Sequence, residues 1–307
     1  GVDVFAPGYE IWNAVPQSEY MNLQGTSMAA PNVTGTLLLL QEHFDNLNGS
    51  FMRAATLKGL ALHTADDIAA SGPDAQTGWG LLNAKKAAET ISAADLDGNA
   101  EIEELTLTNG QTYQVVVDAS GTEDLMASIS WTDPAGTAVG GTNTTTAMLV
   151  NDLDIEITQS TTTYSPWRLN SVTTNGTGDN SVDPYERVDV SGASGSYILT
   201  VTHKGSLSSG SQDFSLIITG GKLATCPSIT TFTGGSWNNG TDDIAKRVVI
   251  DDDYITSLDG DIEACSFTLK AGNTLRVTSA DHLRVDGDIT VESGATLIIE
   301  HEGSLVQ

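Results

Sequence analysis

The sequence predicts a multidomain chain with a largely helical first part, an antiparallel β-sandwich and a β-rich last part. Its 307 residues exceed the roughly 100 to 200 that one domain usually occupies. From about Leu105 the spacing of apolar residues changes from helical to alternating, and brief strand pairs recur near the end of the chain. We therefore expect three domains, over residues 1–94, 95–222 and 223–307.

The first part is expected to be helical apart from its opening. Residues 2–6 have the pattern of a short buried strand, which Pro7 and Gly8 stop. Ser50 and Asn83 are expected to cap the second and third helices, because their side chains can accept hydrogen bonds from free N–H groups of the first turn. The predicted helices cover residues 27–44, 51–63 and 84–91.

The middle part shows the alternation of a β-sheet. In residues 153–157 and 214–218 every second position carries a large apolar side chain that can face a core, and Ala127, Ile129 and Trp131 repeat the pattern. Such runs between about Leu105 and Thr219 fit an antiparallel sandwich or barrel of about six to nine strands.

The last part is built from brief strand pairs joined by Gly, Asn and Asp turns. This recurrence predicts the stacked coils of a β-solenoid, with a plain meander as the alternative. No terminating cap precedes Gln307, which is compatible with further coils beyond it. The pairs are Phe267 and Leu269, Leu275 and Val277, Leu283 and Val285, Ile289 and Val291, and Leu297 and Ile299.

The chain is strongly acidic, with 40 Asp and Glu residues against 13 Lys and Arg and a formal charge of −27. This charge repels a phosphate backbone and argues against nucleic acid as a partner, although it also describes a well-solvated surface. The longest aliphatic run, Leu37–Leu40, is far shorter than the roughly 20 residues of a membrane-spanning helix. Cys226 and Cys265 are either one disulfide or two thiols. Gly1 lies in an apolar stretch without a signal peptide, so we expect a truncation or processing point there.

Ser27 is the candidate nucleophile. A serine hydroxyl needs a neighbouring base, and donors for the developing oxyanion, before it can attack a carbonyl group. Gly25 lets a substrate approach the backbone, and Ser27 opens a helix whose free N–H groups can stabilise negative charge. Pro31 lies in the first turn, where a missing N–H is tolerated. On these residues alone, an ordinary N-cap role for Ser27 stays the alternative.

The string Gly-Thr-Ser-Met-Ala-Ala-Pro at residues 25–31 resembles the nucleophile motif of the subtilisin-like serine peptidases, peptidase family S8. Residues 3–8 resemble the strand and turn upstream of that motif, and residues 78–84 resemble the segment that closes the catalytic domain. The resemblance implies the C-terminal part of an α/β catalytic domain. It makes Ser27 the nucleophile and an oxyanion donor through its N–H, with Thr26 supporting the oxyanion hole. Asn32 stands where many relatives have His.

The activity implied is that of a serine endopeptidase, a hydrolase that cleaves protein or peptide substrates through an acyl-enzyme. In this family the triad Asp and His, and the oxyanion Asn, precede the Ser. All five histidines follow Ser27, so we expect the chain as given to lack the rest of the triad. A hydrolase with the order Ser, Asp, His could use His63, but Ala29 replaces the last Gly of its elbow motif. The alternative function is a non-catalytic surface or adhesion module with a peptidase remnant.

The middle part also holds candidate calcium ligands. Calcium takes about six to eight oxygen ligands, while Asp and Asn also gather in turns because they bond to nearby backbone. Residues 129–133 and 151–154 resemble the jelly-roll domain that follows the catalytic domain in alkaline subtilases and, more distantly, the P domain of proprotein convertases. That resemblance implies a structural calcium ion. The candidate ligands are Asn151, Asp152, Asp154, Asp179 and Asp183.

The last part adds an expectation about location. Residues 235–240 and 262–265 resemble stretches of secreted Bacteroidetes proteins that lie ahead of a sorting signal. The resemblance implies export, so we expect a secreted, extracellular protein and leave open whether it stays at the cell surface. Residues 95–99 resemble a calcium loop, but Ala100 replaces the Gly that an EF-hand requires, so a linker is expected there.

Overall fold

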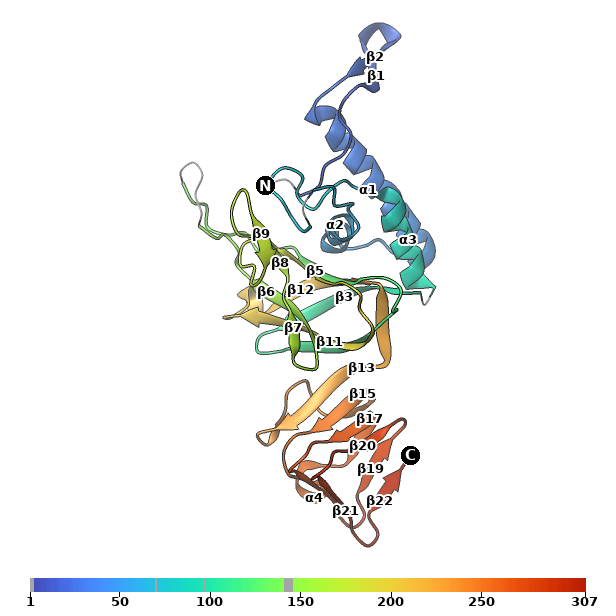
Figure 1. Cartoon of the computed structure of the whole chain (residues 1–307), viewed down its shortest axis with the longest axis vertical. Helices are drawn as coiled ribbons and strands as arrows, with labels where there is room; N and C mark the ends of the chain where they lie inside the picture. Colours follow the sequence, from blue (N-terminus) through green and yellow to red (C-terminus); the bar gives the residue numbers. More distant parts are fainter. Residues whose placement is uncertain (1–2, 70, 97, 141–145) are drawn as a thin grey trace. The chain divides into compact units, whose positions relative to one another are not determined.

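The computed structural model describes residues 3–69, 71–96, 98–140 and 146–307 (Figure 1). The chain is mostly β with few helices. It divides into two compact units. Unit 1 consists of Gly1–Asn109, Ala119–Gly195 and His203–Lys222, and unit 2 consists of Gly110–Asp118, Ser196–Thr202 and Leu223–Gln307.

The helices of unit 1 are α1 (Thr26–Asn48), α2 (Ala54–His63) and α3 (Ala84–Asp95). Asn83 caps α3 as predicted, because its side chain accepts a hydrogen bond from the N–H of Lys86 at 2.9 Å. The prediction that Ser50 caps α2 is wrong. Gln41 exchanges two hydrogen bonds with the backbone of Met52, at 2.9 and 3.0 Å, so the chain stays extended there and α2 begins three residues later than expected.

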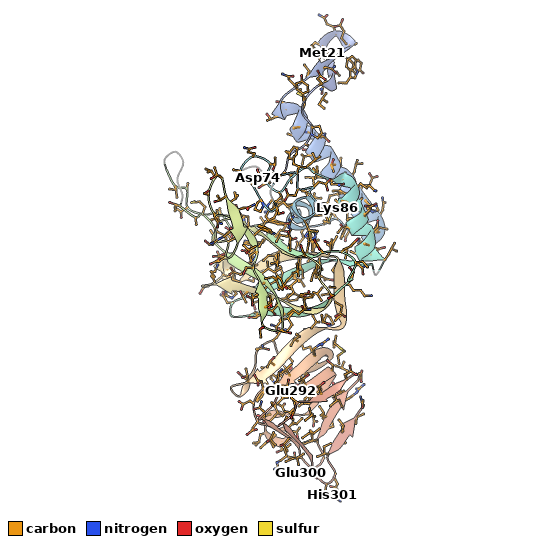
Figure 2. The ribbon with its side chains drawn as sticks, in the orientation of Figure 1. Met21, Asp74, Lys86, Glu292, Glu300 and His301 are labelled. Carbon is orange, nitrogen blue, oxygen red and sulfur yellow. A yellow bond between two sulfur atoms is a disulfide. The ribbon has the colours of Figure 1, made fainter. Side chains whose placement is uncertain are left out.

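A hairpin near the start of unit 1 was not predicted. Strand β1 (Ile11–Val15) pairs antiparallel with β2 (Glu19–Leu23) through the turn η1 (Pro16–Ser18). Trp12 and Tyr20 stack across it with ring centroids 6.2 Å apart, although both side chains are largely exposed. Figure 2 shows Met21 on this hairpin, which precedes α1. In the described part of the strand predicted over residues 2–6, β-pairing is limited to one bridge between Phe5 and Leu81.

An antiparallel sheet forms the centre of unit 1. Its strands are β3 (Ala100–Thr108), β5 (Leu125–Trp131), β10 (Tyr185–Val190) and β12 (Ser211–Thr219), in the order β10-β5-β12-β3. Ala127, Ile129 and Trp131 are buried, as predicted. The intervening Ser128 and Ser130 are buried too, because α2 packs against β5 and β12 on that face.

Four further strands of unit 1 form two antiparallel pairs. Strand β6 (Asp152–Gln159) pairs with β7 (Thr162–Tyr164), and β8 (Trp167–Leu169) pairs with β9 (Asn175–Thr177). Leu153, Ile155 and Ile157 are at most 1% exposed, as the alternation predicted. Asp152 and Asp154 therefore project from the other face of β6.

Unit 2 contains a β-solenoid-like stack of parallel strands. Ile262 pairs with Leu283, and Leu283 pairs with Leu305 in the next coil. Leu275 pairs with Leu297 in the same way. Paired residues are 21 or 22 positions apart, which is the length of one coil. Neighbouring strands of a meander would be antiparallel, so the solenoid-like prediction is confirmed against that alternative.

Two sheets enclose the apolar core of this stack, which includes the fully buried Tyr254 and Phe267. One sheet has the parallel strands β13 (Gly221–Thr233), β15 (Asp243–Ile250), β17 (Ile262–Leu269), β19 (His282–Val285) and β22 (Ser304–Val306), and the other has β16 (Tyr254–Ile255), β18 (Thr274–Val277) and β21 (Thr296–Ile299). The remaining elements of the whole chain are β4 (Tyr113–Ala119), β11 (Gly195–Lys204), η2 (Ser208–Gly210), β14 (Ser236–Trp237), α4 (Thr256–Asp259) and β20 (Ile289–Val291).

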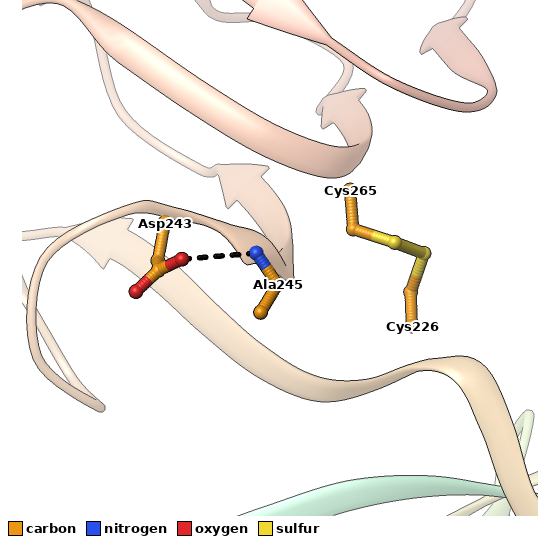
Figure 3. Close-up of a disulfide and its surroundings, with 4 residues drawn as sticks. All are labelled: Cys226, Asp243, Ala245 and Cys265. Carbon is orange, nitrogen blue, oxygen red and sulfur yellow. Dashed lines mark hydrogen bonds between the residues drawn. A yellow bond between two sulfur atoms is a disulfide. The ribbon is translucent and has the colours of Figure 1, made fainter.

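Cys226 of β13 and Cys265 of β17 form a disulfide, with their Cα atoms 5.8 Å apart (Figure 3). Strand β15 lies between these two strands in the sheet. Its register against β17 shifts between Asp243 and Arg247, so three residues of β15 stand opposite Cys265 alone. The Asp243 carboxylate accepts a hydrogen bond from the N–H of Ala245 at 2.9 Å within this bulge. The bulge explains how two cysteines on strands that are not neighbours reach each other.

Candidate active site

Ser27 is the second residue of α1, and its side chain is exposed. Gly25 makes the turn into the helix with a φ of 135°, a conformation that favours glycine. The carbonyl oxygen of Gly25 accepts hydrogen bonds from the N–H groups of Met28 and Ala29, at 3.0 and 3.3 Å. Ser27 thus stands at the N-terminus of a 23-residue helix, where free N–H groups and the helix dipole favour a developing negative charge.

A close backbone contact joins the first motif to the nucleophile motif. The N–H of Gly25 donates to the carbonyl oxygen of Gly8 at 2.8 Å. A Cβ added to Gly8 would lie 2.7 Å from the carbonyl oxygen of Gly25 and 3.1 Å from the Cβ of Ala29. Only glycine permits this approach, so Gly8 positions the turn that presents Ser27.

A second backbone contact joins the first motif to the third. The N–H of Phe5 donates to the carbonyl oxygen of Gly80 at 3.0 Å, within the parallel bridge between Phe5 and Leu81. Gly80 has a φ of 121°, and a Cβ there would lie 2.2 Å from the carbonyl oxygen of Asp66. The three segments that carry the subtilisin resemblance therefore meet in unit 1.

Thr26 and Asn32 occupy the exposed start of α1 on either side of Ser27 in sequence. Thr26 is the first residue of the helix. Its predicted support of an oxyanion hole, the nucleophilic role of Ser27 and the substrate approach at Gly25 stay predictions, because they concern groups that act on a substrate.

Within the described residues, no hydrogen bond connects a histidine to Ser27. His43 lies on α1 sixteen residues after Ser27, about 24 Å along the axis at about 1.5 Å per residue. His63 is buried, with its ring nitrogens 2.8 Å from Ser128 Oγ and 2.9 Å from Thr219 Oγ1. Burial holds the pKa of His63 well below its ordinary value. The arrangement that would use His63 as the base for Ser27 is therefore not formed.

Three of the five predicted calcium ligands meet around Lys204, at the end of β11. Its Nζ lies 3.3 Å from Asp152 Oδ2 and 2.8 Å from Asp154 Oδ1, and it also donates to Oδ1 of Asp179 in the loop after β9. Burial raises the pKa of Asp152 and of Asp154, although Lys204 acts against it. Burial acts to lower the pKa of Lys204, but its hydrogen bonds to Asp154 and Asp179 outweigh burial and raise that pKa. The ammonium therefore stays charged.

The other two predicted ligands lie elsewhere in unit 1. Asn151 is buried, donates from Nδ2 to Gln212 Oε1 at 2.7 Å, and accepts a hydrogen bond from the N–H of Ser208 at 2.7 Å. Its amide group is thus engaged within the protein. Burial raises the pKa of Asp183, and Lys58 is among its charged neighbours.

Sequence reasoning missed Glu186, the second residue of β10. This side chain is fully buried, and its Oε2 accepts a hydrogen bond from the N–H of Ile155 at 2.8 Å. Its Oε1 has no hydrogen-bond partner in the described part of the chain. Burial raises the pKa of Glu186 to about 9, and the charges of Asp154 and Asp152 act in the same direction. An acidic residue inside a buried strand was the available signal, but the contact between β10 and β6 could not be read from the sequence.

Comparison with known proteins agrees with this geometry. Residues 1–80 match the model of the subtilase family. The match includes all of the first two motifs and reaches the start of the third.

Individual relatives cover short parts of both chains. The C5a peptidase of Streptococcus pyogenes serotype M6 is 32% identical over 133 residues, which are 40% of this chain and 11% of that protein. The autotransporter lipoprotein NalP of Neisseria meningitidis serogroup B is 38% identical over 79 residues, 26% of this chain and 7% of NalP. Serotype-specific antigen 1 of Mannheimia haemolytica is 40% identical over 72 residues, 24% of this chain and 7% of that protein. The aligned part thus spans about a tenth or less of each relative's length.

Proposed function

We propose that this chain carries the nucleophile of a secreted serine endopeptidase of subtilisin type. The observation that supports the proposal most is the place of Ser27, which opens α1 beside the Gly8–Gly25 contact in a segment that matches the model of the subtilase family. The name of the streptococcal relative, a C5a peptidase, agrees with peptide-bond hydrolysis.

In the proposed reaction, Ser27 Oγ attacks the scissile carbonyl carbon while a histidine accepts the hydroxyl proton. The N–H of Ser27 and the start of α1 stabilise the oxyanion, and Thr26 supports that site. The histidine then protonates the leaving amine, which leaves an acyl-enzyme that water hydrolyses. Because none of the described histidines bonds to Ser27, we propose that the base belongs to sequence that precedes Gly1 in a longer protein.

We further propose that the sheets of unit 1 form a jelly-roll domain of the kind that follows subtilase catalytic domains, and that the protein is extracellular. The disulfide Cys226–Cys265 favours an oxidising compartment, and the names of two relatives, an autotransporter lipoprotein and a serotype-specific antigen, favour the cell surface. No helix in the described ranges is long and apolar enough to cross a membrane. A structural calcium ion held by the carboxylates of β6 would have to compete with the ammonium group of Lys204, which already donates to them.

A serine-directed fluorophosphonate tests the catalytic proposal. The protein extended upstream through a complete subtilase domain should be labelled at Ser27 and cleave peptides, and Ser27→Ala should lower activity by several orders of magnitude. Ser50→Ala, a change of another exposed serine, is the matched control and should leave labelling unchanged. The 307-residue chain should stay unlabelled, since labelling at Ser27 there would show a base within these residues. An extended protein that neither labels nor cleaves would favour the adhesion module instead.

A further inference from the structure

A cavity of about 410 Å³ lies against the solenoid-like stack, and all the residues that line it belong to unit 2. One wall holds the Cys226–Cys265 disulfide of Figure 3, which ties β13 to β17. Thr268 of β17 and Thr290 of β20 line the cavity next to each other, because the two residues are paired in register. Thr268 follows the buried core residue Phe267, so the cavity lies on the outer face of this sheet.

The cation of this cavity is Arg247 of β15. It is paired with Ile229 of β13 and with Ser266 of β17, and residues paired across neighbouring strands project from the same face. Ile229 is buried there in an apolar cluster with Val116 and Ala224. The position beside Ile229 accounts for the burial of Arg247 Nε.

Arg247 has no partner in the part of the chain that the structure describes. Its guanidinium group makes no hydrogen bond or ion pair there, and its buried Nε lacks an acceptor. A guanidinium group is a permanent cation with five N–H donors, and buried donors almost always have an acceptor. The acceptor therefore has to come from outside these residues, as water or as a ligand. Each of the other five arginines interacts with an acidic side chain or a backbone carbonyl group: Arg53, Arg168, Arg187, Arg276 and Arg284.

Asp288 gives the same cavity an unpaired negative charge. Its side chain is exposed, and among the described residues its carboxylate accepts no hydrogen bond and forms no ion pair. The other carboxylate of the cavity, Asp118, accepts a hydrogen bond from Ser196 Oγ at 2.6 Å. Opposite charges, those of Arg247 and Asp288, thus line one cavity without pairing with each other. A ligand that carries both charges can engage both side chains.

We propose that this cavity binds a small zwitterion of the amino-acid or short-peptide class, with its carboxylate on Arg247 and its ammonium group at Asp288. The two oxygens of a carboxylate match the guanidinium fork, and the hydroxyl groups of Thr268 and Thr290 add neutral hydrogen-bonding partners. A zwitterion has no net charge, whereas the formal charge of −27 repels phosphates and other polyanions. A volume of about 410 Å³ lies within the roughly 300 to 1,000 Å³ of small-molecule sites.

Three related probes test the two charges in the native 307-residue chain. The dipeptide L-alanyl-L-alanine is a zwitterion at about pH 6.5, its amide lacks the carboxylate, and its N-acetyl form lacks the ammonium group. In an NMR titration, the dipeptide should bind with a dissociation constant of about 1 mM. The amide should bind about 10- to 100-fold more weakly, because it loses a charge-assisted hydrogen bond. The N-acetyl form should bind about 2- to 5-fold more weakly, because Asp288 is exposed and its ion pair is screened.

Substitutions assign each charge of the ligand to its residue. Arg247→Gln should weaken binding of the dipeptide about 10- to 100-fold and leave binding of the amide unchanged, because the amide has no carboxylate to lose. Asp288→Asn should weaken binding of the dipeptide about 2- to 5-fold and leave binding of the N-acetyl form unchanged. Arg284→Gln is the matched control, since it removes an arginine of the same stack that pairs with Glu263, and it should not affect binding.

The native chain decides the proposal even if a variant fails to fold, a point that thermal unfolding of Arg247→Gln checks. An amide that binds as tightly as the dipeptide would contradict the role of Arg247. Inorganic phosphate that binds more tightly than the dipeptide would show a general anion site instead. A folded Arg247→Gln chain with native affinity for the dipeptide would overturn the proposal, as would a native chain whose signals no probe shifts well above the expected dissociation constant.

Discussion

Gly59 of α2 packs tightly against the central sheet of unit 1. A Cβ added there would lie 2.3 Å from Ser130 Oγ, 3.1 Å from Ser130 Cβ and 3.5 Å from Ile217 Cδ1. Ser130 is buried and its Oγ donates to the carbonyl oxygen of Ala55 at 2.7 Å, so moving it away from the added methyl group breaks a buried hydrogen bond. We therefore expect Gly59→Ala to destabilise unit 1.

The expected size follows from three contributions to the free energy of unfolding. Overpacking of a filled interior costs about 1 to 3 kcal/mol. Displacing the Ser130 hydroxyl from its buried partner costs about 1 to 2 kcal/mol more. Alanine recovers about 1 kcal/mol of helix propensity relative to glycine. The net loss is about 1 to 4 kcal/mol, which in a unit of this size lowers the melting temperature by about 3 to 12 °C.

Differential scanning calorimetry of the 307-residue chain measures this effect, and Gly35→Ala on α1 is its matched control. A Cβ at Gly35 meets nothing within 4 Å, so the same substitution gains helix propensity without a clash and should stabilise the chain by up to about 1 kcal/mol. Adding Ser130→Ala to Gly59→Ala should cost less than the sum of the two single changes, because the hydroxyl that clashes is gone. If Gly59→Ala melts at or above the native temperature, the packing of α2 on β5 is wrong.

Local patterns predicted the parts of the fold that local physics decides. Alternation along β6 identified Leu153, Ile155 and Ile157 as core residues because the side-chain period of a strand is two. The recurrence of short strands identified the solenoid-like stack, because alternate residues of each short strand face its core. The Asn83 cap followed from the chemistry of one helix end. The predicted Ser50 cap is absent because Gln41, eleven residues before Met52, binds the backbone of Met52 instead.

Contacts between distant segments were not readable. Ser215 and Ile217 of β12 are as buried as the predicted core residues beside them, because α2 covers the face that alternation assigned to solvent. Lys204 and Glu186 were missed for the same reason, since the acidic residues of β6 were recognised without the strands that lie beside them. For the active site, the motif located Ser27 and its turn, while the base depends on residues that no local pattern around Ser27 supplies.

Two further perturbations test the interior of each unit. Reducing the Cys226–Cys265 disulfide should lower the stability of unit 2 by about 2 to 4 kcal/mol, and thiol titration of the unfolded, unreduced chain should find no free thiol. Cys226→Ser should melt like the reduced chain, and a reduced chain as stable as the oxidised one would refute this. His63 gives unit 1 a pH dependence whose sign follows from its burial. Burial lowers the pKa of His63 well below 6.5, so below about pH 6.5 the unfolded state binds a proton that the folded state does not. The stability that neutral His63 contributes is thus fully present above pH 6.5 and declines as the pH falls toward the folded pKa, by up to about 1.4 kcal/mol per pH unit. His63→Gln should be less stable than the native chain at about pH 7.5, and urea unfolding should show the difference shrinking at this rate below pH 6.5, because every other group titrates in both proteins. A difference that stays constant down to about pH 5 would mean that His63 takes up its proton as readily in the folded chain as in the unfolded one.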